Sequence, residues 1–241
     1  MIEQQPSRRA RYRAATREEA KEIALRQLAS GGPEAISLNA IGKAMGTSGP
    51  ALYRYFAGRD ALLTELIIDA YRDLATTIET AAGHGDPAAP SDKLRALAAA
   101  IRAWALAHPH RYLLLYGTPV PGYVAPAGTV PLARRVLTPL LAVLATLPQT
   151  EATTPTLSAL DAQLATWAQQ TGQDVDGSLL RRGLILWTRL HGAISLEVEG
   201  HFGDMGFDPA LLYDTEVDAL LAEMGTIEGT SSNAAAGSPP A

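Results

Sequence analysis

The sequence predicts an all-α fold with two helical domains. Apolar residues recur three and four positions apart through most of the 241 residues, which is the period of an amphipathic helix. No stretch alternates apolar and polar residues as a half-buried strand would. Pairs such as Thr154-Pro155 and Asp208-Pro209 match the N-cap and first position of helices. We therefore expect an N-terminal three-helix domain, a long connecting helix and a larger helical domain.

The stretch from Ser37 to Phe56 organises the N-terminal domain. Ser37 is placed to cap a short helix, and Gly46 tolerates the turn at its end. Thr47 and Ser48 then offer the N-cap of a second short helix. Two short helices joined by a glycine-containing turn predict a helix-turn-helix, whose second helix enters the major groove of DNA.

A longer motif surrounds this unit. It comprises Ile41, Met45-Gly46-Thr47-Ser48, Ala51-Leu52-Tyr53-Arg54-Tyr55-Phe56, Arg59-Asp60 and Leu62-Leu63. The motif resembles the DNA-binding domain of TetR-family transcriptional regulators, with Arg59 in place of the usual lysine and Gly42 in place of a frequent alanine. We expect Gly42 to admit the close approach of another backbone segment.

The resemblance and the residue types together imply a DNA surface. Its expected members are Ser37, Thr47, Ser48, Gly49, Ala51, Tyr53, Arg54, Tyr55 and Arg59. The small residues would lie near base edges, and the tyrosines and arginines would hold phosphates. Phe56 is expected in the core.

Charge is distributed unevenly along the chain. Residues 1–60 contain 10 Lys and Arg against 6 Asp and Glu, whereas residues 61–241 contain 10 against 19. This asymmetry places the basic surface in the same segment as the helix-turn-helix. Residues 1–14 are arginine-rich and lack apolar periodicity, so we expect a flexible basic arm that follows the minor groove, adds nonspecific attraction, or has no role. Thr16 and Glu19 form a capping box, which predicts that the DNA-binding domain, residues 15–60, opens with a helix at Thr16.

The second domain is predicted at residues 61–225. A helix from Gly58 to about Ala82 would span about 35 Å and link the domains. Further helices are expected at residues 91–107, 112–116, 132–147, 155–171, 178–202 and 209–224. Pro139 either kinks its helix or restarts it, and the proline-rich segment 117–131 is expected to cover one side of a pocket. Residues 226–241 are predicted to be a disordered tail.

Bulky residues with polar atoms suggest a small-molecule pocket in this domain. The candidates are Trp104, Tyr112, Tyr116, Tyr123, Trp167, Trp187 and His191. Trp187-x-x-x-His191-Gly192 also resembles the W…HG signature of a class of TetR C-terminal domains. Because His191 lies on an apolar helical stripe, a hydrogen-bonded core histidine is favoured over a ligand contact. Glu197 and His201 lack a third metal ligand, so a solvated helix face is favoured there.

The family resemblance implies a homodimer, because a two-fold protein presents two recognition helices to a palindromic operator. Contributors to the dimer interface are expected among Leu180, Leu186, Leu190, Leu212 and Leu220. The favoured function is a ligand-responsive regulator, a repressor released from double-stranded operator DNA by a small molecule. The alternatives are a nonspecific architectural DNA-binding protein, and a helical small-molecule binder or enzyme with a vestigial head.

The composition narrows the remaining possibilities. The chain has no cysteine, which excludes disulfides and thiolate metal sites. We find no nucleophile elbow or phosphate loop, and we expect neither a cofactor nor an enzymatic activity. No secretory leader is recognised and no apolar run is expected to span a membrane, so we expect the protein in the cytoplasm.

Overall fold

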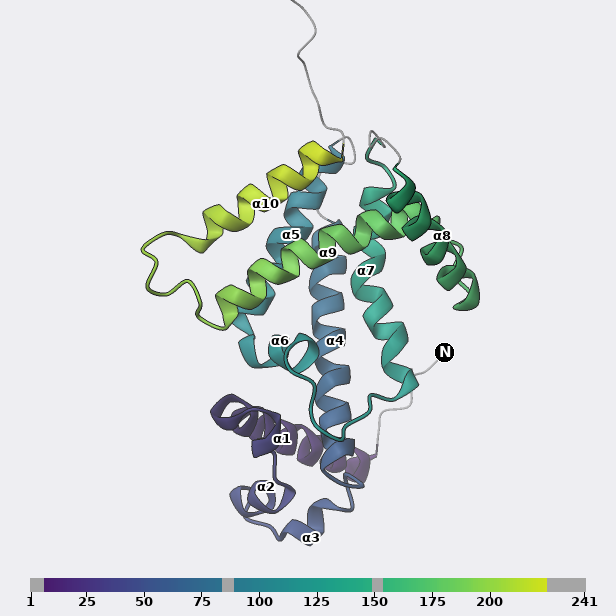
Figure 1. Cartoon of the computed structure of the whole chain (residues 1–241). Helices are drawn as coiled ribbons and strands as arrows, with labels where there is room; N and C mark the ends of the chain where they lie inside the picture. Colours follow the sequence, from purple (N-terminus) through teal and green to yellow (C-terminus); the bar gives the residue numbers. More distant parts are fainter. Residues whose placement is uncertain (1–6, 84–88, 149–153, 225–241) are drawn as a thin grey trace, which may run out of the picture.

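The computed structural model describes residues 7–83, 89–148 and 154–224, and the regular elements of this part are all helices (Figure 1). The helices are α1 (Arg8–Gly31), α2 (Leu38–Ala44), α3 (Gly49–Leu52), α4 (Arg59–Gly83), α5 (Pro90–Ala107), α6 (Pro109–Tyr116), α7 (Val130–Leu144), α8 (Pro155–Gln170), α9 (Gly177–Val198) and α10 (Pro209–Glu223). Short 3-10 turns, η1 (Pro33–Ala35) and η2 (Ala127–Thr129), precede α2 and α7. The all-α prediction is confirmed.

The N-terminal head consists of α1, α2, α3 and the first turns of α4. Leu52 and Phe56 are 0% and 2% exposed and pack with α1 and α4, so the assignment of Phe56 to the core is confirmed. Ser37 caps α2 as predicted, since its Oγ accepts from the amide of Ala40 at 3.4 Å. Gly46 has φ +68°, the left-handed turn conformation that glycine adopts without cost.

The head differs from the sequence prediction at its N-terminus. α1 begins at Arg8, where the Ser7 Oγ accepts from the amide of Ala10 at 3.2 Å. The Thr16 hydroxyl donates to the carbonyl of Tyr12 inside the helix, so the predicted start at Thr16 and the flexible arm are both wrong for residues 8–14. The capping box was a false signal because Ser7 provides an earlier cap. Residues 1–6 of the predicted arm lie outside the described residues.

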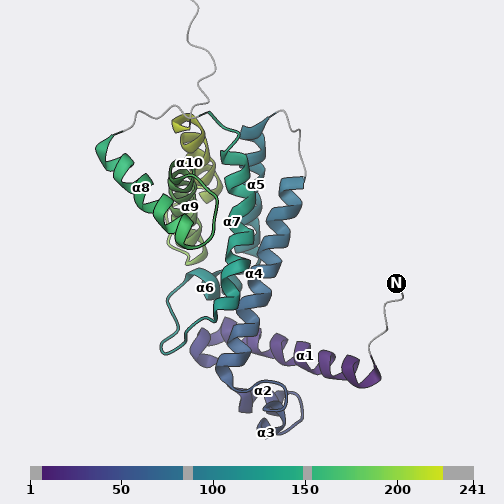
Figure 2. The same cartoon turned by 90° about the vertical axis from the view of Figure 1, so that its right-hand side faces the viewer.

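α4 runs from the head into the second domain, as predicted (Figures 1 and 2). Its first turns place Leu62 and Leu66 in the core of the head, and its later turns place Leu74 and Ile78 in the core of the second domain. α5, α6, α7, α9 and α10 complete that core, and α7 is one helix through Pro139. α9 ends at Val198, four residues before the predicted end, because the glycine at position 200 (φ +81°) turns the chain.

The expectation about membrane spans needs a correction. Residues Ala127–Leu144 form a stretch long and apolar enough to cross a bilayer, with a mean hydropathy of 1.3. In the fold, Val136, Leu140 and Leu144 of this stretch are buried in the core of the second domain. A core helix of a globular domain has the same composition.

The contact between α2 and α3 generates a stability prediction. A Cβ on Gly42 would lie 2.9 Å from the backbone nitrogen of Gly49, so the expected close backbone approach is confirmed. Gly42→Ala should lower the free energy of unfolding by about 1–3 kcal/mol, because backbone must move to admit the methyl group. Urea unfolding measures the change. Gly83→Ala at the end of α4, where a Cβ meets nothing within 4 Å, is the control; equal effects of the two variants would contradict the account.

Candidate DNA-binding surface and ligand pocket

The predicted DNA residues gather around α3 at the end of the head farthest from the second domain (Figure 1). Ser37, Thr47, Ser48, Tyr53 and Arg54 are exposed, whereas Gly49, Ala51, Tyr55 and Arg59 are partly buried. Exposed Lys43 at the end of α2 adds a cation that the motif did not single out. The face therefore combines small neutral residues with flanking cations and a phenol.

Two of the predicted phosphate residues have internal partners. The Arg59 guanidinium donates to the carbonyl of Pro33 at 2.7 Å, which ties α4 to η1. The backbone carbonyl of Tyr55 accepts from Arg17, and the guanidinium of Arg13 lies 5.9 Å from the Tyr55 ring centroid. Arg13 also donates to the carbonyl of Arg54 at 3.1 Å. Arg13, from the predicted arm, and Arg17, from the next turn of α1, thus hold the segment that follows α3.

The Gly49 position explains how α3 is set against α2. A Cβ there would lie 2.0 Å from Oδ1 of Asn39, so any larger residue would require the Asn39 side chain to move. Proline follows at position 50 in the first turn of α3. Ser48 occupies the N-cap position, although its side chain makes no capping hydrogen bond.

Four of the predicted effector residues form one aromatic cluster between α6 and α9. The ring of Trp187 stacks on His191 at 5.4 Å, and Tyr116 lies edge-on to Trp187 at 5.3 Å and to His191 at 4.9 Å. The Tyr112 hydroxyl shares hydrogen bonds with Nδ1 of His191 at 2.8 Å and with Oγ of Ser195 at 3.0 Å. The hydrogen bond agrees with the favoured interpretation of His191, although its side chain is partly and not fully buried.

Burial governs the protonation of this cluster. It raises the pKa of Tyr112 to about 12 and also raises that of Tyr116, so both phenols stay neutral near pH 7. Burial lowers the pKa of His191, which favours the neutral imidazole. The cluster is therefore an uncharged contact between two helices.

The apolar pocket lies beside this cluster, between α7, α8 and α9. It has a volume of about 330 Å³ and is lined by Arg134, Leu137, Thr138, Leu140, Leu141, Leu164, Trp167, Gln173, Leu180, Gly183, Leu184 and Trp187. Of the predicted effector residues, Trp167 and Trp187 line it. Trp187 therefore belongs both to the pocket wall and to the aromatic cluster.

Two predicted effector residues lie elsewhere. Trp104 is buried and donates from Nε1 to Asp73 at 3.0 Å, which fixes α5 to α4. Tyr123 packs against the core of the head and its hydroxyl shares a hydrogen bond with Thr64 at 2.9 Å. The segment that carries Tyr123 therefore contacts the head and does not line the apolar pocket.

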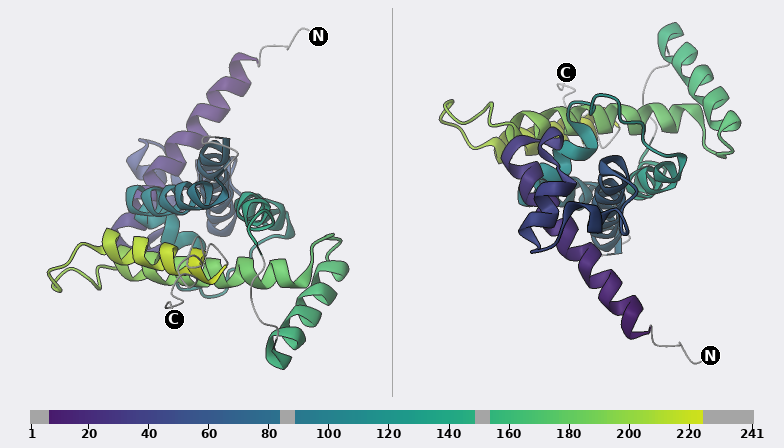
Figure 3. Two further views of the ribbon diagram at one scale, coloured as in Figure 1. Left: turned by 90° about the horizontal axis from the view of Figure 1, so that it is seen from above. Right: turned by 90° about the horizontal axis from the view of Figure 1, so that it is seen from below.

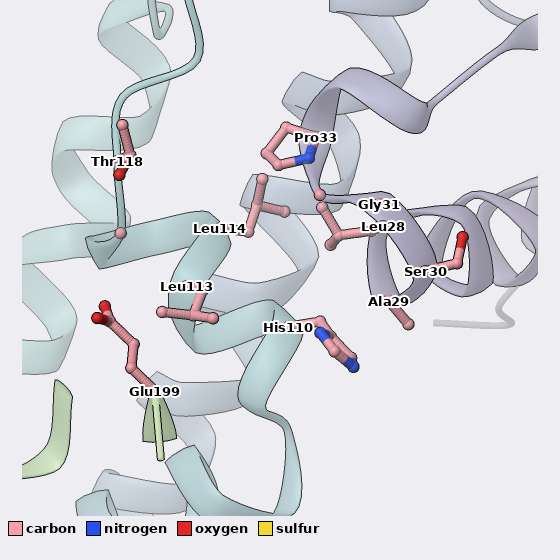
Figure 4. Close-up of a pocket in the computed structure, with 12 residues that line it drawn as sticks. Leu28, Ala29, Ser30, Gly31, Pro33, His110, Leu113, Leu114, Thr118 and Glu199 are labelled. Atoms are coloured by element: carbon pink, nitrogen blue, oxygen red, sulfur yellow. The ribbon is translucent and has the colours of Figure 1, made fainter. Parts of the chain in front are cut away.

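A second hollow separates the head from the second domain (Figure 4). It is a groove of about 440 Å³ between the C-terminal end of α1, the helix α6 and Glu199. His110 and Leu114 of α6 lie on the side of the head, where Leu28 and Pro33 are, whereas Leu113 lies toward Glu199 (Figure 4). The two domains are thus incompletely packed on this side.

The predicted dimer residues are mostly internal. Leu186, Leu190 and Leu220 are 0–2% exposed inside the protomer, so their assignment to a dimer interface is wrong. Leu180 is buried beside the pocket, and only Leu212 presents a partly exposed side chain. Helical periodicity identified the apolar faces of α9 and α10, but it did not separate the face packed in the core from the exposed face.

The half-buried His191 generates a pH prediction. The pKa of His191 is lower in the folded protein than the ordinary histidine value of about 6.5. As the pH drops through about 6.5, the histidine is protonated in the unfolded chain before it is protonated in the folded protein, so the free energy of unfolding should fall. We expect the urea midpoint to fall less between about pH 7.5 and pH 5.5 in His191→Gln than in the unmodified protein. His201→Gln, at an exposed site, is the matched control. Identical pH dependence in all three proteins would contradict this assignment.

Comparison with known proteins agrees with both parts of the structure. Residues 22–66 match the model of bacterial regulatory proteins of the tetR family, and residues 94–220 match the tetracyclin repressor-like C-terminal domain. HTH-type transcriptional regulators of Mycobacterium tuberculosis and Mycobacterium bovis are 37% identical over 209 residues, covering 83% of this chain and 88% of theirs.

Solved structures show the same fold. The regulatory protein SCO4313 is 46% identical, with a TM-score of 0.78 over 90% of this chain and 100% of its own. The regulator FadR of Bacillus subtilis, solved with stearoyl-CoA, shares the fold at 13% identity and a TM-score of 0.51, over 86% of this chain and 98% of its own. With both domains matched and its relatives aligned over most of its length, the chain belongs to the TetR family of transcriptional regulators.

Proposed function

We propose that this transcriptional regulator is a homodimeric, cytoplasmic repressor that a small molecule releases from its operator. The observation that supports it best is the double role of Trp187, which lines the apolar pocket and stacks on His191 of the aromatic cluster. A ligand that displaces the Trp187 ring acts directly on the contacts that hold α6. The family assignment favours this function over the architectural and enzymatic alternatives.

α6 carries the effect of the ligand to the head. On one side Tyr112 and Tyr116 contact α9, and on the other Leu114 and Leu115 pack against the core of the head. Arg111 of the same helix donates to Asp73 of α4 at 2.8 Å. A shift of α6 therefore changes how the head packs against the second domain and how α4 is oriented. The groove beside α1 provides room for this movement.

The pocket lining indicates an amphipathic effector. Leucines and tryptophans make up most of its wall, and Arg134 is its one basic residue among the lining side chains, with Thr138 and Gln173 adding hydrogen-bonding groups. Such a wall suits an apolar molecule with a single acidic group. A fold of this kind holds an acyl-CoA in the FadR neighbour.

The exposed face of α9 supports a dimer. Leu184, Thr188, Gly192 and Leu196 form a stripe at intervals of four residues that is exposed and contains no charge. A two-fold axis brings such a stripe onto its own copy, where charges would repel. A Cβ on Gly192 meets nothing within 4 Å, so this position leaves room for the close approach of a helix from a second copy. This stripe replaces the buried leucines as the proposed interface.

The DNA-binding role generates a selection experiment. Random duplex DNA selected by the purified protein should yield a palindromic site, because a two-fold protein reads two half-sites. Arg54→Ala should weaken binding to that site and reduce the slope of log K against log salt by about 1.8, since the dimer loses two phosphate contacts, one from each copy. Lys93→Ala on α5 is the control and should match the unmodified protein. No enriched site at low or physiological salt would contradict the proposal.

The effector class is tested at Arg134. Thermal-shift screening of apolar carboxylates and of their uncharged amides should find stabilisation mainly by the acids. Arg134→Ala should reduce the affinity for an acid by about tenfold and leave that for the matching amide unchanged, because only the acid loses an ion pair. Arg72→Ala on α4 is the control. An equal loss for acid and amide would assign Arg134 a structural role.

A further inference from the structure

α8 extends away from the body of the protomer. It projects past the layer formed by α9 and α10 (Figures 2 and 3). Among its residues only Ala168 is fully buried, while Leu160 and Trp167 are 39% and 48% exposed. Two contacts nevertheless fix its position on α9. Arg181 pairs with Asp161 at 2.7 Å, and the backbones approach closely at Gly177, where a Cβ would lie 2.0 Å from the Asp161 carbonyl oxygen.

The opposite end of α9 carries a second projection, the loop of residues 199–208. It extends to the other side of the bundle from α8 (Figures 1 and 3). The rings of Phe202 and Phe207 pack on each other at 5.4 Å, and Met205 is 65% exposed at the tip. Glycines at 200 and 206 with positive φ give the loop a defined shape. The loop thus presents ordered apolar side chains to solvent.

The mouth of the ligand pocket is also exposed and apolar. Trp167 on α8 and Leu184 on α9 line the pocket, and both leave nearly half of their surface in solvent. Leu184 is at the same time the first residue of the uncharged α9 stripe. The mouth of the pocket is therefore continuous with the proposed dimer interface.

A two-fold axis at Gly192, the one stripe residue without a side chain, brings these three features together. From the helical rise per residue, Leu184 lies about 12 Å along α9 from Gly192, and Val198, where the helix ends, lies about 9 Å from Gly192 in the other direction. When two copies of α9 pair in opposite directions about Gly192, the mouth at Leu184 faces the start of the 199–208 loop of the second copy. In a single copy α8 and the 199–208 loop project from opposite ends of α9 (Figure 3), so the same rotation carries α8 of one copy to the end where the loop of the other copy extends.

We propose that the 199–208 loop of one copy covers the pocket of the other, with Met205 and Phe207 completing a wall that begins with Trp167 and Leu184. This inference rests on the proposed homodimer and goes beyond it, because each effector site is then built from two chains. Ligand binding and dimerisation are consequently coupled, and each strengthens the other by the same factor.

Cross-linking tests the arrangement without any ligand. The chain has no cysteine, so Met205→Cys combined with Leu184→Cys, or with Trp167→Cys, introduces one reactive pair at exposed positions. Treatment with a bismaleimide should give a covalent dimer on denaturing gels for both double variants. The control is Met205→Cys with Val124→Cys, at an 85% exposed site on the segment beside the head, together with each single variant. These should remain monomeric on the gel.

Sedimentation of the same samples separates the two ways of failing. A dimer in solution that cross-links no more than the control overturns the covered pocket and leaves the proposed dimeric regulator intact. A monomer in solution at micromolar concentration overturns the homodimer itself, and the covered pocket with it.

Discussion

The structure depends on the position of α6, an eight-residue helix that two hydrophobic cores share. Tyr112 is 1% exposed in the core of the second domain, while Leu114 packs against the core of the head. A helix this short has little stability of its own, so its position is set by tertiary contacts. A change in the packing of either core can therefore alter the packing of the other, because α6 and α4 have residues in both.

The contact between α6 and α9 differs in kind from the ion pairs that join other helices of the second domain. Arg102 donates to both carboxylate oxygens of Glu197, at 2.7 and 2.5 Å, and joins α5 to α9, while Arg189 pairs with Glu216 and Glu223 of α10. Such bidentate pairs have strict geometry. α6 instead meets α9 through rings and neutral hydrogen bonds, which repack more readily. The domain therefore combines a fixed frame with one adjustable contact, at the place where the pocket and the head communicate.

The sequence predicted the elements that local chemistry determines. N-caps at Ser37, Thr154 and Asp208 and the turn at Gly46 were identified correctly because each depends on residues within a few positions. The close approach at Gly42 was also expected, since a glycine within a helix needs a reason. The start of α1 was missed because Ser7 lies in an arginine-rich stretch with no apolar pattern, so the more obvious capping box was chosen.

The site was predicted less completely, because it depends on which face of a helix meets which neighbour. Aromatic residues were grouped by type, yet Trp104 and Tyr123 pack in other places, and the pocket wall consists largely of leucines that resemble any core residue. The same ambiguity assigned Leu186 and Leu190 to a dimer interface although they are buried. Periodicity identifies an apolar face, and only the tertiary structure shows what covers it.

Calorimetry of a pocket ligand on the free protein and on the protein bound to its operator tests the central claim most directly. If the pocket and the head are coupled through Trp187 and α6, operator DNA should weaken ligand binding by about 5–150-fold, the same factor by which the ligand weakens DNA binding. Equal ligand affinity in the two states would show that the pocket and the DNA surface are independent.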